Sequence, residues 1–224
     1  MQLLGTGTRQ SMRAPTSPVE IRVATDEDLQ SCMALDDSYV STHTWQVESR
    51  RGEPGASPFT MHSTVTLGDT PLSVIFRPVK LPRPRRVVGP VAASMRDGSE
   101  QSALSRLAQW RAADLVLVAE QGSKLCGYVA ITVVPGSGIG WIGGLVVANS
   151  MRRQGIGSML MAAARRWARY GQGQNVRSFM LEVPTKNYPA VSFCRKEGFT
   201  FCGHTDYSFS NGDVVLLFVS PVVI

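Results

Sequence analysis

The sequence predicts an α/β (α+β) fold, in which a mixed, mainly antiparallel sheet is flanked by helices. Short apolar runs of strand length recur along the chain, and turns rich in Gly, Asn, Asp and Pro separate them. One longer stretch, residues 156–170, places its apolar side chains on one face of a 3.6-residue period, as an amphipathic helix does. Because strands dominate and helices lie between several of them, we expect helices to cover a sheet.

Length and composition are those of one globular domain. The 224 residues are 43% hydrophobic and 18% charged, which is enough to bury the core of a single domain. No apolar run approaches the roughly 20 residues of a membrane span. Residues 1–18 are rich in Gly, Thr, Ser and Pro and lack the apolar segment of a signal peptide. We therefore expect a flexible tail over 1–18, followed by a single domain over 19–224.

Cysteine spacing and net charge indicate the cellular compartment and the kind of binding partner. The four cysteines form no C-x-x-C pair, so reduced thiols in the cytoplasm are expected. The formal net charge of +6 favours anionic partners. The densest basic run lies among prolines in 76–90 without interleaved aromatics, so we expect a solvated loop or edge strand and not a nucleic-acid surface. Its basic residues are Arg77, Lys80, Arg83, Arg85 and Arg86.

The chain begins with an expected strand and helix. Residues 19–24 alternate apolar and charged side chains, as a half-exposed strand does. Thr25 precedes three acidic residues, a pattern that predicts an N-cap and a helix over 25–37. The side chains expected to face inward from this helix are Leu29, Cys32 and Met33.

The next part of the N-terminal half adds a hairpin and a helix. Residues 38–58 are polar and contain no motif that we can interpret. Two β-rich runs, 59–67 and 72–79, flank Gly68-Asp69-Thr70-Pro71 and predict a hairpin. An amphipathic helix is expected over 98–113.

The C-terminal half is expected to contain a meander followed by alternating strands and helices. The expected strands are 115–120, 125–134, 139–147, 176–183, 199–208 and 214–219. The central helix over 156–170 is joined by a short helix over 189–197 that has proline at its first position. Asn211-Gly212 predicts the turn of a closing hairpin.

One glycine pattern is rejected as a cofactor site. Gly138-Ile139-Gly140-Trp141-Ile142-Gly143 matches the dinucleotide fingerprint G-x-G-x-x-G. That fingerprint opens a helix, whereas an apolar, strand-like run follows here. We expect these glycines to allow a bulge or a splayed strand instead.

The turn before the central helix has the chemistry of a phosphate site. Gly155 and Gly157 remove Cβ atoms where the helix starts, so backbone N–H groups and the helix dipole can approach an anion. Arg152 and Arg153 add formal charge at the same place. The same residues also fit a tight strand-to-helix turn with solvated arginines, and the turn alone does not decide between the two.

A second stretch downstream decides the interpretation. It carries Glu182, Asn187, Ala190 and Gly198-Phe199. With Arg152-x-x-Gly155-x-Gly157 before it, the chain over about 114–219 resembles the GNAT acyltransferases (GCN5-related N-acetyltransferases). It is nearest in motif to the ribosomal-protein N-terminal and streptothricin acetyltransferases. The resemblance implies a GNAT-type sheet, to which the predicted hairpin in the N-terminal half is an addition.

The resemblance also implies a cofactor site. Acetyl-CoA is expected as the acyl donor, and no metal is expected. The strand before the turn is expected to bind the pantetheine arm and to polarise the thioester carbonyl through its N–H groups, and the turn to bind the pyrophosphate. The residues so assigned are Leu145, Val146, Val147, Arg152, Arg153, Gln154, Gly155, Ile156, Gly157, Ser158 and Asn187.

Glu182 is the candidate general base. It is a charged residue in an apolar strand, and a partly desolvated carboxylate is suited to take a proton from an attacking amine, directly or through water. A glutamate in a matching Leu-Glu-Val stretch has this role in the branch that acetylates ribosomal-protein N-termini. The alternative is a glutamate on the exposed face of a strand.

Cys194 departs from the family pattern. The family usually has a tyrosine at this position, which is placed to protonate the leaving thiolate. A cysteine thiol, with a reference pKa of about 8.5, is better matched to the thiol of coenzyme A and is a candidate acid. The alternative is a small buried residue, with protonation by water, Tyr207 or Tyr188.

Two classes of function follow. The first is an enzyme that transfers acetyl from acetyl-CoA to a primary amine, either on a small molecule such as an antibiotic or on a protein N-terminus. The second is an acyl-CoA-binding sensory or structural module with weak or no catalysis, because Cys194 replaces the usual acid. No membrane partner is expected, and a homodimer stays open because dimers are common in proteins of this kind.

Overall fold

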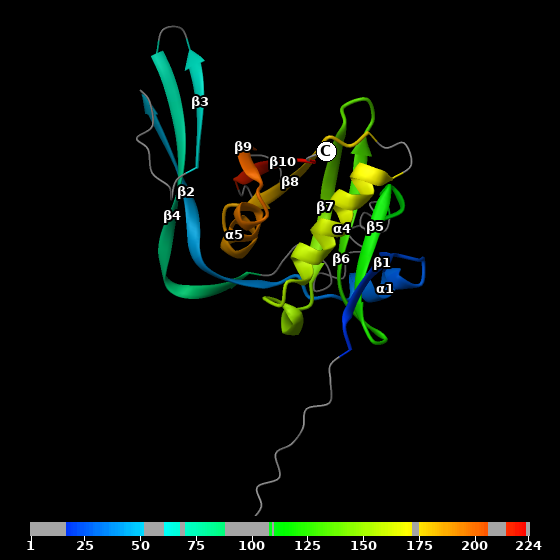
Figure 1. Cartoon of the computed structure of the whole chain (residues 1–224). Helices are drawn as coiled ribbons and strands as arrows, with labels where there is room; N and C mark the ends of the chain where they lie inside the picture. Colours follow the sequence, from blue (N-terminus) through cyan, green and yellow to red (C-terminus); the bar gives the residue numbers. More distant parts are fainter. Residues whose placement is uncertain are drawn as a thin grey trace, which may run out of the picture.

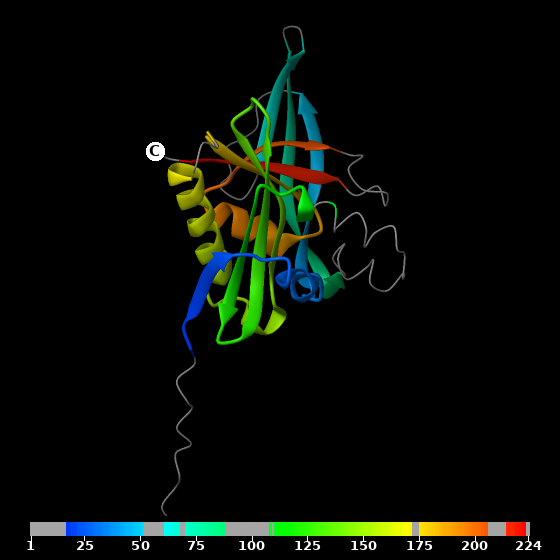
Figure 2. The same cartoon turned by 90° about the vertical axis from the view of Figure 1, so that its right-hand side faces the viewer.

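The computed structural model describes residues 17–51, 61–67, 70–87, 108, 110–171, 175–205 and 214–222. These residues form two sheets, one of seven strands and one of three, with helices packed on the larger sheet (Figure 1). In Figure 1 the three-stranded sheet stands beside the larger sheet, and in Figure 2, which is turned by 90°, it lies behind the larger sheet. The predicted class, a mixed sheet flanked by helices, is confirmed.

The seven-stranded sheet is mainly antiparallel. Its order is β1-β5-β6-β7-β8-β10-β9, and β7 with β8 is its one parallel pair in the described part of the chain. The strands are β1 Val19–Val23, β5 Leu115–Gln121, β6 Lys124–Val134, β7 Ile139–Val147, β8 Ser178–Pro184, β9 Thr200–Thr205 and β10 Val215–Pro221. Each matches an expected strand to within a few residues.

Hydrophobic side chains cover both faces of this sheet. On one face lies α4, Ile156–Tyr170, which contacts β1, β5, β6 and β7. Its apolar side chains join the main core with Phe179 and Phe218, which are completely buried. A smaller cluster around Cys32, Val118 and Tyr128 lies apart from the main core. None of the helices in the described ranges is both long and apolar enough to span a bilayer.

The hairpin of the N-terminal half belongs to a sheet of its own. β3, Met61–Leu67, and β4, Thr70–Val87, pair antiparallel as predicted, and β2, Tyr39–Arg51, pairs with the other edge of β4. The polar segment 38–58, which showed no motif, therefore contains a long strand. The backbone N–H of Trp45 donates to the carbonyl of Thr185 at 3.0 Å, which joins this sheet to the end of β8.

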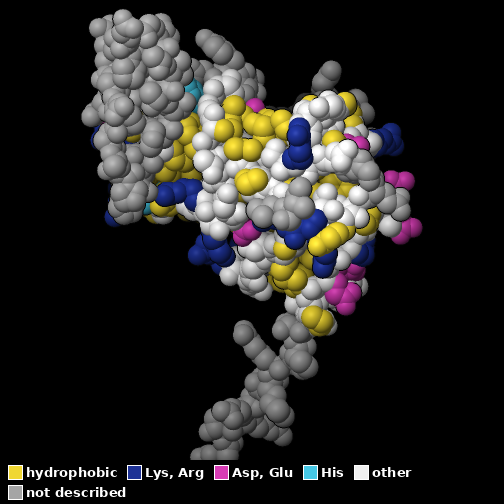
Figure 3. All heavy atoms as spheres, turned by 45° about the horizontal axis from the view of Figure 1, so that its top comes forward, with side chains coloured by type: hydrophobic (Ala, Val, Ile, Leu, Met, Phe, Trp, Pro, Cys, Tyr) yellow, Lys and Arg dark blue, Asp and Glu magenta, His cyan; other side chains and the backbone are white. Residues whose placement is uncertain are grey.

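The basic run lies on the exposed part of β4, so the expectation of an edge strand is confirmed. β3 pairs with β4 only over 70–76, so the basic residues follow the point where β4 becomes an edge. All five of its basic side chains are exposed. On the face shown in Figure 3, Lys and Arg side chains are scattered among neutral and hydrophobic ones instead of forming one stripe.

The first helix is shorter than predicted. α1 spans Asp28–Met33, and Glu27, not Thr25, is its N-cap. The Asp28 carboxylate folds back to accept hydrogen bonds from the N–H and the hydroxyl of Thr25, and two nitrogens of Arg22 hold it at 2.7 and 2.8 Å. This network fixes 25–27 in a turn, so the predicted helix is present but its predicted bounds, 25–37, were too wide. Cys32 is buried as expected.

Several predicted features lie wholly or partly outside the described residues. These are the tail over 1–16, most of the helix over 98–113 and the turn at 211–213. The described end of that helix retains an N–H to carbonyl bond from Ala112 to Ala108 at 2.9 Å. Trp110, at the same end, packs edge-on against Tyr128, with ring centroids 5.9 Å apart.

Candidate active site

The candidate site begins where two neighbouring strands separate. β7 and β8 pair only over Ile139–Trp141 and Ser178–Met180. Beyond this point β7 remains paired with β6, and β8 remains paired with β10. Across the gap, the facing edges of 142–147 and 181–184 have no strand partner among the described residues. The carbonyls of Val147 and Pro184 accept from Arg152 and from the N–H of Asn187, and the other backbone groups that face the gap are available to a ligand, as at a sheet edge.

The rejected glycine pattern contributes to this separation. No helix opens at Gly138–Gly143, because the residues continue into β7. The register between β6 and β7 shifts so that Gly143 has no partner on β6, which is a β-bulge. The expectation of a bulged, splayed strand is confirmed.

The turn after β7 has the expected anion-binding geometry. A 3₁₀ turn over Asn149–Met151 leads to Gly155, which has φ 86° and is the N-cap of α4. Arg153 also has a positive φ, 66°, which is uncommon for a residue with a Cβ. No side chain among the described residues caps α4. The N–H groups of its first turn therefore have no side-chain partner there. Such N–H groups, together with the helix dipole, attract a phosphate.

Arg152 is half-buried, and its guanidinium is directed at three backbone carbonyls. Its nitrogens donate to the carbonyl oxygens of Val147 at 2.9 Å, Ser38 at 2.6 Å and Asp36 at 2.9 Å. Burial lowers the pKa of Arg152 from its ordinary value, and Asp36 and Asp37 oppose that change. Its side chain is therefore engaged with backbone carbonyls, and a ligand that reaches this turn meets backbone N–H groups.

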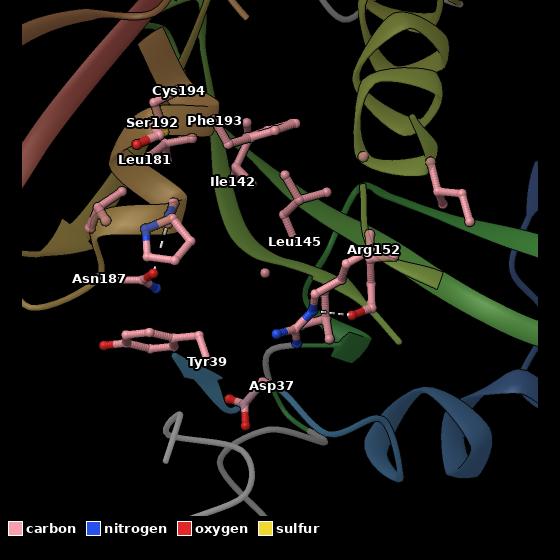
Figure 4. A pocket seen from close by; sticks show the side chains of 18 of the residues that line it. Asp37, Tyr39, Ile142, Leu145, Arg152, Leu181, Asn187, Ser192, Phe193 and Cys194 are labelled. Atoms are coloured by element: carbon pink, nitrogen blue, oxygen red, sulfur yellow. Dashed lines mark hydrogen bonds between the residues drawn. The ribbon is translucent and has the colours of Figure 1, made fainter. Parts of the chain in front are cut away.

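A cleft of about 450 Å³ connects the turn to the gap between the strands. Figure 4 shows it from close by, with Tyr39 and Asp37 on one side and three residues of the helix α5, Tyr188–Lys196, on the other. These three are Ser192, Phe193 and Cys194. The cleft brings together most of the residues singled out in the sequence. Those lining it are Leu145, Val146, Val147, Arg152, Arg153, Gly155, Ile156, Gly157, Ser158, Glu182, Asn187 and Cys194.

Among the described residues that the sequence singled out, Gln154 and Tyr188 do not line the cleft. The side chain of Gln154 turns back and donates to the carbonyl of Ser150 at 3.2 Å. Tyr207 lies outside the described residues. Tyr188 is described, but its ring stacks on His43 with a centroid distance of 4.4 Å and does not line the cleft.

The second helix forms the opposite wall of the cleft. α5 spans Tyr188–Lys196, and the side-chain oxygen of Asn187 caps it by accepting from the N–H of Ala190 at 3.1 Å. Ser158 on α4 donates its hydroxyl to Glu197 at 2.5 Å, and Arg165 donates to the Glu197 carbonyl at 2.7 Å. These bonds hold the start of α4 against the end of α5.

Glu182 lies on β8 at the gap. Phe179, Leu181 and Val183 are buried in the main core, and the residues between them are only partly buried. Because side chains alternate along a strand, Glu182 points to the face opposite that core. It lines the cleft from that side.

Cys194 also lines the cleft, but it is 2% exposed. Burial is the main cause that raises the pKa of this thiol to about 12. The similarity in acidity between this thiol and coenzyme A, on which the acid role was predicted, is therefore lost in the folded protein. The small-buried-residue alternative fits this geometry better.

Asp37 and Tyr39 are cleft residues that the sequence did not identify as site residues. Both follow α1, at the start of β2, and line the cleft beside Arg152 and Asn187. Asp36 and Asp37 form an acidic pair in the sequence that ends two residues before Tyr39. No spacing rule linked that pair to a turn more than 100 residues later, so only the structure joins them.

The comparisons with known proteins agree with this geometry. Residues 91–199 match the family model described as the Acetyltransferase (GNAT) family. The nourseothricin acetyltransferase structure is similar, with a TM-score of 0.66 and 21% identity, covering 92% of this chain and 99% of that one. A protein from Bacillus anthracis str. Ames, provisionally named a streptothricin acetyltransferase and solved with acetyl coenzyme A, has a TM-score of 0.63 and 17% identity, covering 91% of this chain and 98% of that one.

The family match and the shared fold confirm the resemblance that the sequence motifs indicated. The chain therefore has the fold of these two acetyltransferases, and its residues 91–199 match the GNAT family model. No curated protein matches the sequence significantly. Within the described ranges, His, Cys, Asp and Glu side chains form no group of three or more that would hold a metal ion.

Proposed function

We propose that the protein transfers an acetyl group from acetyl-CoA to a primary amine by direct attack on the thioester. One observation carries this proposal: a single cleft runs from the uncapped start of α4 along the free edge of β7 to Glu182. This arrangement provides an anion site, an extended edge for an amide-containing arm, and a carboxylate at the far end. Acetyl-CoA has the matching parts in the same order.

The backbone is proposed to hold the acyl donor. The N–H groups at 155–158 would bind its pyrophosphate, and the free edge of β7 at 145–147 would bind its pantetheine arm. The bound group would supply an activated acetyl thioester. An N–H group of the same edge would stabilise the negative charge that develops on the carbonyl oxygen. Because backbone groups have this role, the side chains of Leu145, Val146 and Val147 need only pack.

Glu182 is proposed as the general base. The amine must lose a proton as its nitrogen forms a bond to the carbonyl carbon and the bond from that carbon to sulfur breaks. Glu182 faces the cleft from the side opposite the main core, so it is proposed to take this proton, directly or through one water. The departing thiolate is proposed to take its proton from solvent, because burial leaves Cys194 a weak acid.

The proposed acceptor is a small-molecule amine of the streptothricin type. Support comes from the likeness to two acetyltransferases named for nourseothricin and streptothricin, which extends over nearly the whole of both chains. Asp37 and Glu182 are the acidic residues of a cleft that Arg152, Arg153 and Lys196 also line, and they are proposed as partners for a cationic amine. A protein N-terminus is the second candidate acceptor.

The four cysteines are free, and this supports a reducing compartment, which we propose to be the cytoplasm.

An acyl-CoA-binding module with little catalysis is the alternative, and the burial of Cys194 favours it. Release of free CoA thiol, measured with a panel of amines, separates the two. Turnover with streptothricin or nourseothricin, but not with peptides bearing a free N-terminus, is expected for the proposed enzyme. Turnover with the peptides alone would contradict a small-molecule acceptor and would support a protein N-terminus as the acceptor. Acetyl-CoA binding without turnover on any amine would support the module.

A further inference from the structure

We propose that Arg152 is a positioning residue that fixes the acceptor wall of the cleft to the turn that binds the acyl donor. This inference rests on the proposed function, because it assigns two ends of the same cleft to two substrates. It gives Arg152 a role through its contacts within the protein instead of a direct contact with phosphate.

The contacts of Arg152 join three segments that are distant in the sequence. Its Nε donates to the carbonyl of Val147, at the end of β7. Its two terminal nitrogens donate to the carbonyls of Ser38 and Asp36, in the connection between α1 and β2. The distances to Val147 and Asp36 are 2.9 Å, which is usual for an N–H to oxygen bond, and the distance to Ser38 is shorter, at 2.6 Å. One planar guanidinium thus holds both the donor edge and the connection.

The connection is held from two further directions. Asn149, in the same turn, donates from its side-chain nitrogen to the Asp36 carboxylate at 2.7 Å. Arg86, on β4, donates to the same carboxylate at 3.2 Å and to the Ser38 hydroxyl at 3.0 Å. The hydrogen bond that the Ser38 side chain makes is the main cause that lowers the pKa of Asp36, so this carboxylate stays ionised. The turn and the three-stranded sheet therefore meet at residues 36–38.

The connection carries the acceptor side of the cleft. Asp37 lies between the two residues that Arg152 holds, and Tyr39 follows directly. Both side chains line the cleft, in view of Asn187 and the α5 residues (Figure 4). A displacement of residues 36–38 would therefore move Asp37 and Tyr39 within the cleft.

The geometry couples the two ends. Arg152 stays charged in the folded protein and lies in the same turn as the N–H groups of 155–158, and its three bonds go to the carbonyls of Val147, Ser38 and Asp36. An anion bound at 155–158 would restrict the movement of this turn, and with it the carbonyls that Arg152 holds. By linkage, a firmly held connection would in turn favour the anion. We therefore infer that donor binding orders the acceptor wall, so the acceptor binds more tightly to the protein when the donor is present.

The test compares Arg152→Gln and Arg152→Lys with Arg166→Gln, a matched loss of charge at an exposed position on α4. Asn149→Ala is a milder variant, in case Arg152→Gln does not fold. Hydrogen exchange of a peptide covering 34–39 is measured with and without CoA, and calorimetry measures CoA binding directly. Steady-state rates then give KM separately for amine and acetyl-CoA.

We expect faster exchange at 34–39 in Arg152→Gln and, less so, in Asn149→Ala, with no change in Arg166→Gln. CoA should slow exchange at 34–39 in the wild type more than in Arg152→Gln. The amine KM should rise about tenfold in Arg152→Gln, more than the KM for acetyl-CoA, as expected for the loss of hydrogen bonds to a charged group. Arg152→Lys keeps the charge but loses the planar guanidinium that donates in several directions. The amine KM of this variant should therefore stay above the wild-type value.

Unchanged exchange at 34–39 in Arg152→Gln would overturn the inference, whether or not CoA binds. A rise in the acetyl-CoA KM alone would also overturn it, and would return Arg152 to a direct phosphate role. Absence of CoA binding to the wild type would instead contradict the proposed function, and calorimetry detects that separately.

Discussion

Gly157 and Phe193 approach so closely that a Cβ on residue 157 would lie 3.0 Å from the Phe193 ring. Gly157 is in the first turn of α4 and Phe193 is on α5, and both line the cleft. The second glycine of the turn therefore has a packing reason in addition to the approach of a phosphate. The start of α4 and the wall formed by α5 are in direct contact at this point.

Gly157→Ala tests that contact. Ala favours a helix by up to about 1 kcal/mol, but overpacking against Phe193 is expected to cost about 1–3 kcal/mol, so stability should fall slightly. Acetyl-CoA affinity should fall more clearly, because the ring must shift within the cleft. Chemical denaturation and calorimetry measure the two effects. The control is Gly203→Ala, whose added Cβ would make an ordinary contact with Leu217 at 3.5 Å; equal affinity losses in both variants would refute this explanation.

Glu182→Gln should lower kcat/KM by about 10²–10⁴, the usual contribution of a general base. The loss should be greatest at the lower end of pH 6–9 and smaller at high pH, where more of the amine arrives without its proton. Glu20→Gln, an exposed glutamate on β1, is the control and should keep the wild-type rate. Full activity of Glu182→Gln across this pH range would remove Glu182 from the mechanism.

Cys194→Ala should retain most of the activity, because the buried thiol keeps its proton at the pH values where the enzyme is assayed. The pKa of Cys194 is raised to about 12 in the folded protein, from a value of 9.0. Between these two values the unfolded chain has lost the thiol proton and the folded chain has not, so folding stability falls as pH rises. Cys194→Ala should therefore show a weaker alkaline loss of stability than wild type, as measured by denaturant unfolding at pH 8–10. An alkaline inflection in the rate profile that vanishes in the variant would instead indicate an acid role.

Asp28→Asn should destabilise the protein by about 1–3 kcal/mol, since it weakens the bonds that Arg22 and Thr25 make to this carboxylate. The Arg22 hydrogen bond is the main cause that holds the pKa of Asp28 well below its usual range. This stabilisation is present above the unfolded pKa of about 3.9 and is lost as pH falls below it. Acid unfolding of Asp28→Asn should consequently be less steep than that of wild type. Asp26→Asn, at an exposed position in the same turn, is the control.

The core of the fold was predictable because local patterns determine it. Alternating strands, the amphipathic stretch at 156–170 and the glycines of the turn each indicate a structure without reference to distant residues. The start of α1 was not predictable from local sequence. The Asp28 carboxylate accepts a hydrogen bond from Arg22 on β1, which is a contact between separate elements of the fold. β2 was missed because its residues are largely polar, and its pairing with β4 is a tertiary interaction.

The candidate site was predictable to a similar degree. Motif spacing identified the turn and Glu182, both of which line one cleft. Motif spacing could not give the direction of the Arg152 guanidinium. That direction depends on the carbonyls of Asp36 and Ser38, which lie more than 100 residues earlier in the sequence. The sequence could not decide between the two interpretations of Cys194 for a related reason, since the burial of its thiol depends on the packing of α5.

Thermal unfolding with excess acetyl-CoA, with ATP and NAD at equal concentration as controls, tests the central claim most directly. At about 100 times the dissociation constant, a ligand that binds only the folded chain stabilises it by about 2.7 kcal/mol. For a chain of this size the midpoint should rise by roughly 5–10 °C with acetyl-CoA and much less with ATP or NAD. An unchanged midpoint with acetyl-CoA, or an equal rise with all three ligands, would contradict an acetyl-CoA site in this cleft.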